Sequence, residues 1–217
     1  MALPLIQKIF IICVLKSLNK TNNLLYLTGN DAILYNFKYK KYFKLLLSKD
    51  IIKLGRIVDN SLFINNFKRF LNKHNINNNI FGESIIIIVQ PGYEVNDFEN
   101  LKTIFLSLNF KCITFLDEVK VYNLNLNNVW INIQKNYYIL SLLDNYGKIK
   151  SYYVINNYFK NEMHLYKFIK YIVQDKSIYL FGNYVDNFFN VFEKLFRNKV
   201  YLFSNNETFI IDSVIKM

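Results

Sequence analysis

Apolar and polar positions along the first part of the chain predict strands first and helices later. Leu24–Leu27 and Ala32–Phe37 are β-favouring runs on either side of a glycine-containing turn, which predicts a β-hairpin. From Ser61 to about His74 apolar residues recur at helical spacing, and Ser84–Val89 is a continuous β-branched run. Such a run is typical of a strand that is covered on both faces, so the pattern indicates an α/β fold with a central sheet.

The segment after this strand predicts a crossover. Pro91-Gly92 ends the strand, Asp97 is placed to cap a helix that runs to about Leu108, and Cys112–Leu116 forms the next strand. A strand–helix–strand unit in one sheet is almost always a right-handed crossover between parallel strands. A short helix from Asp117 is expected to follow.

The strand pattern restarts after Leu126, which indicates a second half. Three antiparallel strands are predicted first, and strands and helices then alternate to the end of the chain. The expected elements are the strands Val129–Ile133, Tyr137–Leu143 and Lys148–Val154, helix Glu162–Val173, strand Ser177–Phe181, helix Val185–Phe196, strand Lys199–Phe203 and a short element at Phe209–Ile215. We therefore expect two halves, residues 1–126 and 127–217.

Composition supports a folded chain but says little about partners. Apolar residues make up 52% and aromatic residues 18%, which is enough for a core. The net charge is +11, but 24 of the 27 basic residues are Lys, and Asn, Ile, Tyr and Phe are also frequent. All are spelled by A/T-rich codons, so an AT-rich genome explains part of the charge.

Ile9–Leu15 is expected to be a buried strand and not a signal peptide or membrane span, because Lys8 splits a short apolar run.

Histidine and cysteine usage does not predict a metal site. Cys13 and Cys112 lie in apolar runs, where a cysteine usually behaves as a small buried hydrophobe. His74 and His164 have no second ligand at a suitable spacing. We expect no metal ligands.

Several motifs, in this order, resemble the actin-like ATPases. Gly55–Asn60 (GRIVDN) is similar to the glycine-led turn that introduces a helix and a strand ending in proline, here Pro91. Asn100–Phe115 resembles the helix and strand that follow. Val129–Ile149 is similar to the strand, phosphate loop and strand of the second half, and Ser177–Phe203 to the region that cradles the adenosine. The chain resembles a highly divergent, shortened actin-related protein, closer to the eukaryotic actin-related branch than to bacterial homologues.

The resemblance implies a duplicated actin-like (ribonuclease H-like) fold of class α/β. Each of the two halves would hold a mixed sheet flanked by helices. Only about 45 residues separate Asn132 from Ser177, and Leu24–Gly55 leaves similarly little room. The outer subdomains of the family are therefore expected to be reduced or missing.

The same resemblance assigns the nucleotide site. It places Glu118 at the position that orients the attacking water. It places the nucleotide contacts at Asn132, Gln134, Lys135, Gly182 and Asn183.

The phosphate loops depart from the family pattern. After Ile9–Leu15 the chain has Lys16–Lys20, without the expected acid and glycines, and the other candidate loop, Thr28–Asp31, is typical of an ordinary hairpin turn. In the second loop Asn132 replaces the expected Asp. Backbone amides reach phosphate closely only where glycines allow it, and magnesium needs hard oxygen ligands. We therefore expect a pseudo-ATPase with no bound cofactor, in which Glu118 is a solvated or capping carboxylate.

The leading hypothesis is a non-catalytic structural subunit of a larger protein assembly. Its partners would be other subunits, including actin or actin-related proteins, in the cytoplasmic cytoskeleton, with the nucleus and chromatin as the alternative. Aromatic side chains suit such contacts because they combine apolar area with a polar tip. The candidate interface residues are Trp130, Tyr152, Tyr153, Tyr158, Phe159 and Tyr166.

Two alternatives belong to other functional classes. One is a working actin homologue that binds ATP with magnesium and polymerises. The other is a nucleic-acid module, because Lys38–Lys44 (KYKKYFK) interleaves basic and aromatic residues. Lysines on an edge strand more often form a solvated face that prevents edge pairing, so nucleic acid is the weaker alternative.

Overall fold

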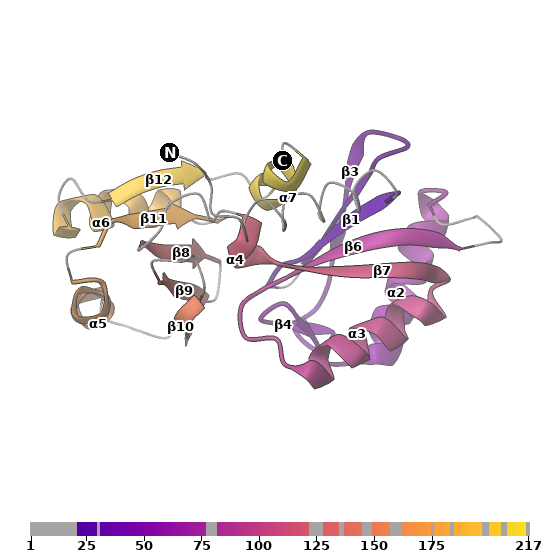
Figure 1. Ribbon diagram of the computed structural model, residues 1–217, viewed down its shortest axis with the longest axis horizontal. Coiled ribbons are helices and arrows are strands. Elements are labelled where there is room, and N and C mark those ends of the chain that lie inside the picture. The colour runs from indigo at the N-terminus through magenta and orange to yellow at the C-terminus, as the bar shows by residue number, and fades with distance from the viewer. Residues whose placement is uncertain are drawn as a thin grey trace. The chain divides into compact units, whose positions relative to one another are not determined.

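The computed structural model describes residues 21–29, 31–76, 82–121, 128–134, 137–144, 149–156, 162–174, 176–182, 185–196, 200–204 and 208–215. The chain divides into two compact units, Met1–Glu118 with Ile211–Met217, and Val119–Ile210. Each contains its own five-stranded sheet (Figure 1). The expected halves, 1–126 and 127–217, differ from these units at two places: residues 119–126 group with the second unit, and Ile211–Met217 group with the first. The strand expected at Ile9–Leu15 lies outside the described residues.

The first unit holds a mixed sheet in the order β3-β2-β1-β6-β7. Strands β1, β2 and β3 form an antiparallel meander, whereas β1, β6 and β7 run parallel. The bounds are β1 (Asn23–Leu27), β2 (Asp31–Asn36), β3 (Lys41–Leu46), β6 (Glu83–Val89) and β7 (Phe110–Asp117), with a small hairpin of β4 (Ile52–Lys53) and β5 (Arg56–Ile57). The predicted hairpin, central strand and parallel crossover are all present.

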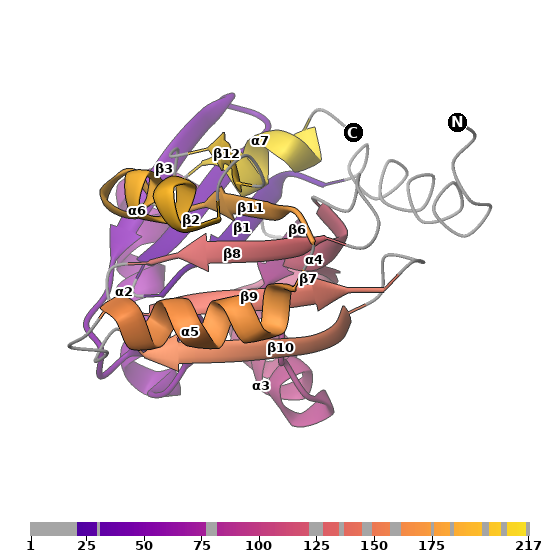
Figure 2. The same ribbon diagram turned by 90° about the vertical axis from the view of Figure 1, so that its left-hand side faces the viewer.

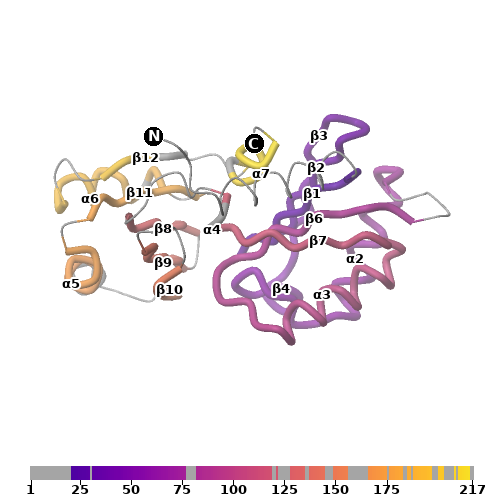
Figure 3. The backbone as a smooth tube through the Cα atoms, viewed as in Figure 1, coloured from indigo at the N-terminus to yellow at the C-terminus, as the bar shows by residue number. Residues whose placement is uncertain are grey.

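Helices α2 (Asn60–Lys73) and α3 (Val95–Ser107) lie on one face of this sheet (Figure 3). Their apolar stripes meet the inward side chains of β1 and β6 in one core, where Phe63, Phe67 and Phe105 are fully buried. Asp59 caps α2 by accepting a hydrogen bond from the Leu62 amide (2.8 Å). The Asp97 carboxylate accepts one from the Glu94 amide at the start of α3 (2.9 Å).

The second unit repeats this topology. Its sheet has the order β10-β9-β8-β11-β12, with β8, β9 and β10 antiparallel and β8, β11 and β12 parallel. Helices α5 and α6 pack against one face of it (Figure 2). The bounds are β8 (Val129–Ile133), β9 (Tyr137–Leu143), β10 (Ile149–Asn156), α5 (Glu162–Val173), β11 (Ile178–Phe181), α6 (Asp186–Phe196) and β12 (Val200–Ser204), while α4 (Glu118–Val121) and α7 (Phe209–Ile215) complete the described elements. The two sheets therefore have the same strand order and directions, which indicates an internal duplication.

Two further observations concern expectations from the sequence. Cys112 is exposed on β7, so the expectation of a buried thiol is wrong at this position. The reason is that β7 is the last strand of its sheet, and several of its side chains face solvent.

No helix in the part of the chain that the structure describes is both long and apolar enough to cross a membrane.

Candidate functional site

Equivalent hairpin turns follow the first strand of each sheet. In the first unit the Thr28 amide donates to the Asp31 carbonyl (2.8 Å), and in the second the Gln134 amide donates to the Tyr137 carbonyl (3.0 Å). Two residues lie between the bonded positions in both turns. Since β1 occupies the place in its sheet that β8 occupies in the other, the first loop of the duplicated fold is Thr28–Asp31. The expectation that the first phosphate loop lies at Lys16–Lys20 is therefore wrong.

The first turn uses its own polar groups internally. The Thr28 side chain is buried, and its hydroxyl lies 3.2 Å from the backbone nitrogen of Asp31, which donates to it. The Asp31 carboxylate lies 3.3 Å from the Lys44 ammonium. The hydroxyl and the acid that a phosphate loop would direct at its ligand therefore hold this hairpin together.

Gly55 is the first residue of the motif that resembles the actin-like ATPases. It packs against the carboxyl end of the first sheet. Its φ is +74°, and a Cβ there would lie 2.5 Å from Gln90 Oε1 and 3.2 Å from the Leu27 carbonyl. The buried Gln90 side chain thus occupies the space beside this turn, directly after β6. Glycine fits because it tolerates a positive φ and has no side chain.

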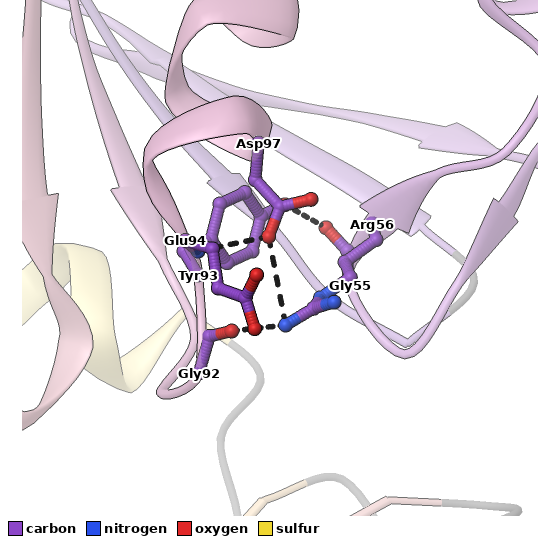
Figure 4. A network of polar contacts seen from close by, with 6 residues as sticks. All are labelled: Gly55, Arg56, Gly92, Tyr93, Glu94 and Asp97. Atoms are coloured by element: carbon purple, nitrogen blue, oxygen red, sulfur yellow. Dashed lines mark hydrogen bonds and ion pairs between the residues drawn. The ribbon is translucent and has the colours of Figure 1, made fainter.

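A polar network ties this turn to the start of α3 (Figure 4). The Tyr93 hydroxyl donates to the Gly55 carbonyl, and the Arg56 guanidinium donates to the Gly92 carbonyl and lies 3.6 Å from the Asp97 carboxylate. Burial raises the pKa of Tyr93 well above its ordinary value, and the Asp97 charge adds to this rise while the Arg56 charge opposes it. The Tyr93 hydroxyl therefore remains a donor at neutral pH. Sequence reasoning missed this network, although Arg56 directly follows the recognised glycine.

Glu118 begins α4 immediately after β7 and is completely buried. One of its carboxylate oxygens accepts a hydrogen bond from the Tyr26 hydroxyl on β1 (2.8 Å). The expectation of a solvated carboxylate is therefore wrong, whereas the alternative that it caps α4 stays a prediction. The physical reason is that Tyr26, 92 positions earlier, supplies a buried donor. A role for Glu118 in orienting water stays a prediction.

Replacing Tyr26 by phenylalanine is expected to lower the free energy of unfolding by about 1 to 3 kcal/mol, because it removes a buried hydrogen bond to a carboxylate. Urea denaturation followed by circular dichroism measures the loss. The matched control is Tyr39→Phe, whose hydroxyl donates to the Asn75 carbonyl at an exposed site, 3.2 Å away. That change should cost about 0.5 kcal/mol or less, and equal losses in both variants would contradict the importance of the buried bond.

The second turn brings together three of the five predicted nucleotide contacts. Asn132 and Gln134 are buried, and the Gln134 amide nitrogen donates to Asn132 Oδ1 (2.6 Å). Gly182, at the end of β11, has a φ of +115°, and a Cβ on it would lie 2.3 Å from the Ile133 carbonyl and 2.8 Å from Asn132 Oδ1. Lys135 and Asn183 lie outside the described residues.

This arrangement is a pair of neutral amides at the end of β8. The two side chains hydrogen-bond to each other. Because both are neutral amides, neither carries the negative charge that a carboxylate would. Within the described ranges no group of three or more His, Cys, Asp or Glu side chains could hold a metal ion. The pair suits hydrogen bonding within the turn better than ion coordination.

Comparison with known proteins concerns the fold. No protein-family model and no curated protein matches the sequence. The structure is similar to the ethanolamine utilization protein EutJ from Carboxydothermus hydrogenoformans, with a TM-score of 0.61 and 13% identity over 94% of this chain and 98% of that one. A Bacteroides thetaiotaomicron protein with an actin-like ATPase fold and unknown function is similar at a TM-score of 0.56 and 10% identity, over 92% of this chain and 98% of that one. The chain has an actin-like ATPase fold.

A third similar structure is an AlfA filament bound to AMPPNP, with a TM-score of 0.56 and 10% identity over 86% of this chain and 90% of that one. At these identities the likeness shows the actin-like fold alone. The branch of the superfamily therefore stays a prediction, as does the fate of the nucleotide site.

The predicted interface aromatics of this actin-like chain have different environments. Tyr152 and Tyr153 are exposed on β10, at 41% and 37%, and Tyr166 is half-buried against Phe196, with ring centroids 5.4 Å apart. Trp130 is only 1% exposed and stacks on Tyr179 (4.7 Å), so its assignment to a partner surface is wrong. It lies on a central strand, where both sheet faces are covered. Tyr158 and Phe159 lie outside the described residues.

Proposed function

We propose that this actin-fold chain is a non-catalytic structural subunit of a larger protein assembly, with a degenerate nucleotide site and no cofactor of its own. The observation that carries the proposal is the buried Asn132–Gln134 amide pair, which lies at the end of β8 beside Gly182. A carboxylate at this place would face the magnesium of a bound nucleotide in an active family member, and a neutral amide supplies no such charge.

The geometry of both turns supports the same conclusion. Each is closed by a backbone hydrogen bond across two residues, so the amides of Thr28 and Gln134 already have partners within the hairpins. In the first turn the Thr28 hydroxyl and the Asp31 carboxylate are already engaged by the hairpin and by Lys44. A phosphate would have to displace these partners.

The surface of the second unit supports a role in protein contacts. Tyr152, Tyr153 and Val154 are exposed in succession on β10, one of the two edge strands of the described sheet. Tyr171 on α5 is 83% exposed. Tyrosine adds contact area at a low entropic cost, and we place the main partner contact on residues 152–171 of this unit. The cytoskeleton is the proposed compartment, with chromatin as the alternative.

Isothermal titration calorimetry with ATP and magnesium tests the degenerate site. We expect no saturable binding at submicromolar concentrations and no phosphate release, because the second turn lacks its carboxylate. An actin-fold ATPase measured in parallel is the positive control. Submicromolar binding that is abolished by Asn132→Ala with Gln134→Ala would contradict the proposal.

The subunit role is tested by isolating the tagged protein from its own cells and identifying stoichiometric partners. The purified complex should melt at a higher temperature than the isolated chain, because partner binding stabilises the folded state. Recovery of a monomer whose melting is unchanged in cell extract would remove the reason to call it a subunit.

One observation favours an ATP-binding homologue as the second candidate. The first turn contains Thr28, Gly29 and Asp31, and Glu118 lies buried directly after β7. The first unit therefore retains acids and a hydroxyl of the kind that a nucleotide site uses. The similar AlfA filament is bound to AMPPNP. The calorimetric experiment decides between the two candidates, since tight magnesium-dependent binding is expected only of the second.

A further inference from the structure

The free edge of β3 carries a concentration of positive charge. Within the described part of the chain β3 is hydrogen-bonded to β2 alone, and it ends the first sheet. Residues 37–49 contain five lysines and no acidic residue: Lys38, Lys40, Lys41, Lys44 and Lys49. We call these lysines and the strand they flank the β3 edge. An edge strand presents a row of backbone donors and acceptors that another extended segment can use.

We propose that the β3 edge binds an extended acidic segment of a partner protein, which adds to the first sheet as an additional strand and places its carboxylates beside the lysines. The inference rests on the proposed function, because it names the chemistry of one of the partners. In this mode backbone hydrogen bonds supply affinity, and the side chains flanking the edge supply selectivity.

Charge decides against a second copy of the chain as the occupant. If two β3 strands paired, lysines of both copies would lie side by side, and like charges at this distance repel. Lys38, Lys40 and Lys41 are exposed, whereas Lys44 is partly neutralised by Asp31 at 3.3 Å. The same lysines that prevent self-pairing attract a strand with alternating acidic residues.

The open strand edge favours a peptide over a nucleic acid. The Tyr39 hydroxyl donates to the Asn75 carbonyl, and the Lys38 ammonium lies over its ring, 5.5 Å from the centroid. The Tyr42 ring lies 4.9 Å from that of Tyr35, and its hydroxyl donates to the Asp212 carboxylate. Both hydroxyls are therefore used within the chain, although the two side chains stay 39% and 40% exposed. A nucleic acid has no row of alternating backbone N–H and C=O groups to pair with an open strand edge, so the backbone of β3 favours a peptide.

The test uses the full-length chain and a fluorescein-labelled peptide of alternating Glu and Val residues, with binding measured by fluorescence anisotropy. We expect Lys38→Glu with Lys41→Glu to weaken binding about tenfold, because two attractions become repulsions. The matched control is Lys68→Glu with Lys102→Glu, which makes the same charge change at exposed positions on α2 and α3. It should change affinity by less than about twofold. Lys38→Gln with Lys41→Gln provides a milder variant, and circular dichroism checks the folding of each.

Two further probes separate strand addition from other binding modes. A peptide of equal charge with proline in place of each valine lacks every second backbone N–H donor, and we expect it to bind far more weakly. Equal binding of both peptides would overturn strand addition. Tighter binding of single-stranded oligothymidylate, lost in the same lysine variant, would replace the acidic segment by nucleic acid. Absence of peptide binding, in a chain that still copurifies with stoichiometric partners and ignores ATP, would overturn this inference while leaving the proposed function intact.

Discussion

Replacing Trp130 by alanine is expected to lower the free energy of unfolding of the second unit by about 3 to 5 kcal/mol, because it removes a large buried side chain from the centre of a sheet. Trp130 is 1% exposed, and its ring stacks on Tyr179, which stacks in turn on Tyr201 (5.2 Å). The loss is measured by urea denaturation followed by circular dichroism.

The matched control is Tyr171→Ala, because the Tyr171 side chain is 83% exposed on α5. It should change stability by less than about 0.5 kcal/mol, as surface substitutions usually do. The pair also separates core from interface residues: Tyr171→Ala should weaken partner recovery without destabilising the chain, whereas Trp130→Ala should destabilise it even when no partner is present. Equal stability of both variants would contradict the buried position of Trp130.

Replacing Gly182 by alanine is expected to cost about 3 kcal/mol and to disturb the Asn132–Gln134 pair. At a φ of +115° a side chain is strained, and the new Cβ would lie 2.3 Å from the Ile133 carbonyl and 2.8 Å from Asn132 Oδ1. Backbone must therefore move at the end of β8. Trp130 is the only tryptophan in the chain, so its fluorescence during urea denaturation reports on the unit that is changed.

Gly55→Ala is the comparison for this prediction. Its φ of +74° is also unfavourable for alanine, but the nearest atom belongs to the end of the Gln90 side chain, and the nearest backbone atom, the Leu27 carbonyl oxygen, is 3.2 Å away. We expect a cost of about 1 kcal/mol, smaller than at Gly182. A Gly182→Ala variant as stable as the parent chain would show that the end of β8 tolerates movement. It would contradict a rigid Asn132–Gln134 pair beside Gly182.

Local sequence patterns predicted most elements to within a few residues. The strands Val129–Ile133 and Tyr137–Leu143 and the helix Glu162–Val173 have the predicted bounds, because their periodicity and the turn residues around them are encoded over short stretches of chain. The resemblance likewise predicted that Asn132, Gln134 and Gly182 would lie together, and the actin-like topology brings them to the ends of adjacent strands β8 and β11.

The identity of the first loop could not be read from local pattern. An apolar run at Ile9–Leu15 and the run at Leu24–Leu27 have the same local signature, and only the pairing of β1 with β2 on one side and β6 on the other places β1 at the centre of the sheet. The short strands β4 and β5 were also missed, because two residues each are too few to form a pattern.

The sequence by itself determined the order of strands and helices, the two-fold repetition of that order and the actin-like character of the chain. The tertiary structure alone decided which polar and aromatic side chains are buried. The sequence predicted a solvated Glu118, but Tyr26 from a distant strand donates a hydrogen bond to it in the interior. It predicted Trp130 at a partner interface, but this ring is buried and stacks on Tyr179. The physical reason is that strand and helix periodicity depends on near neighbours, whereas the cost of burying a polar or aromatic group is set by partners that only folding brings into contact.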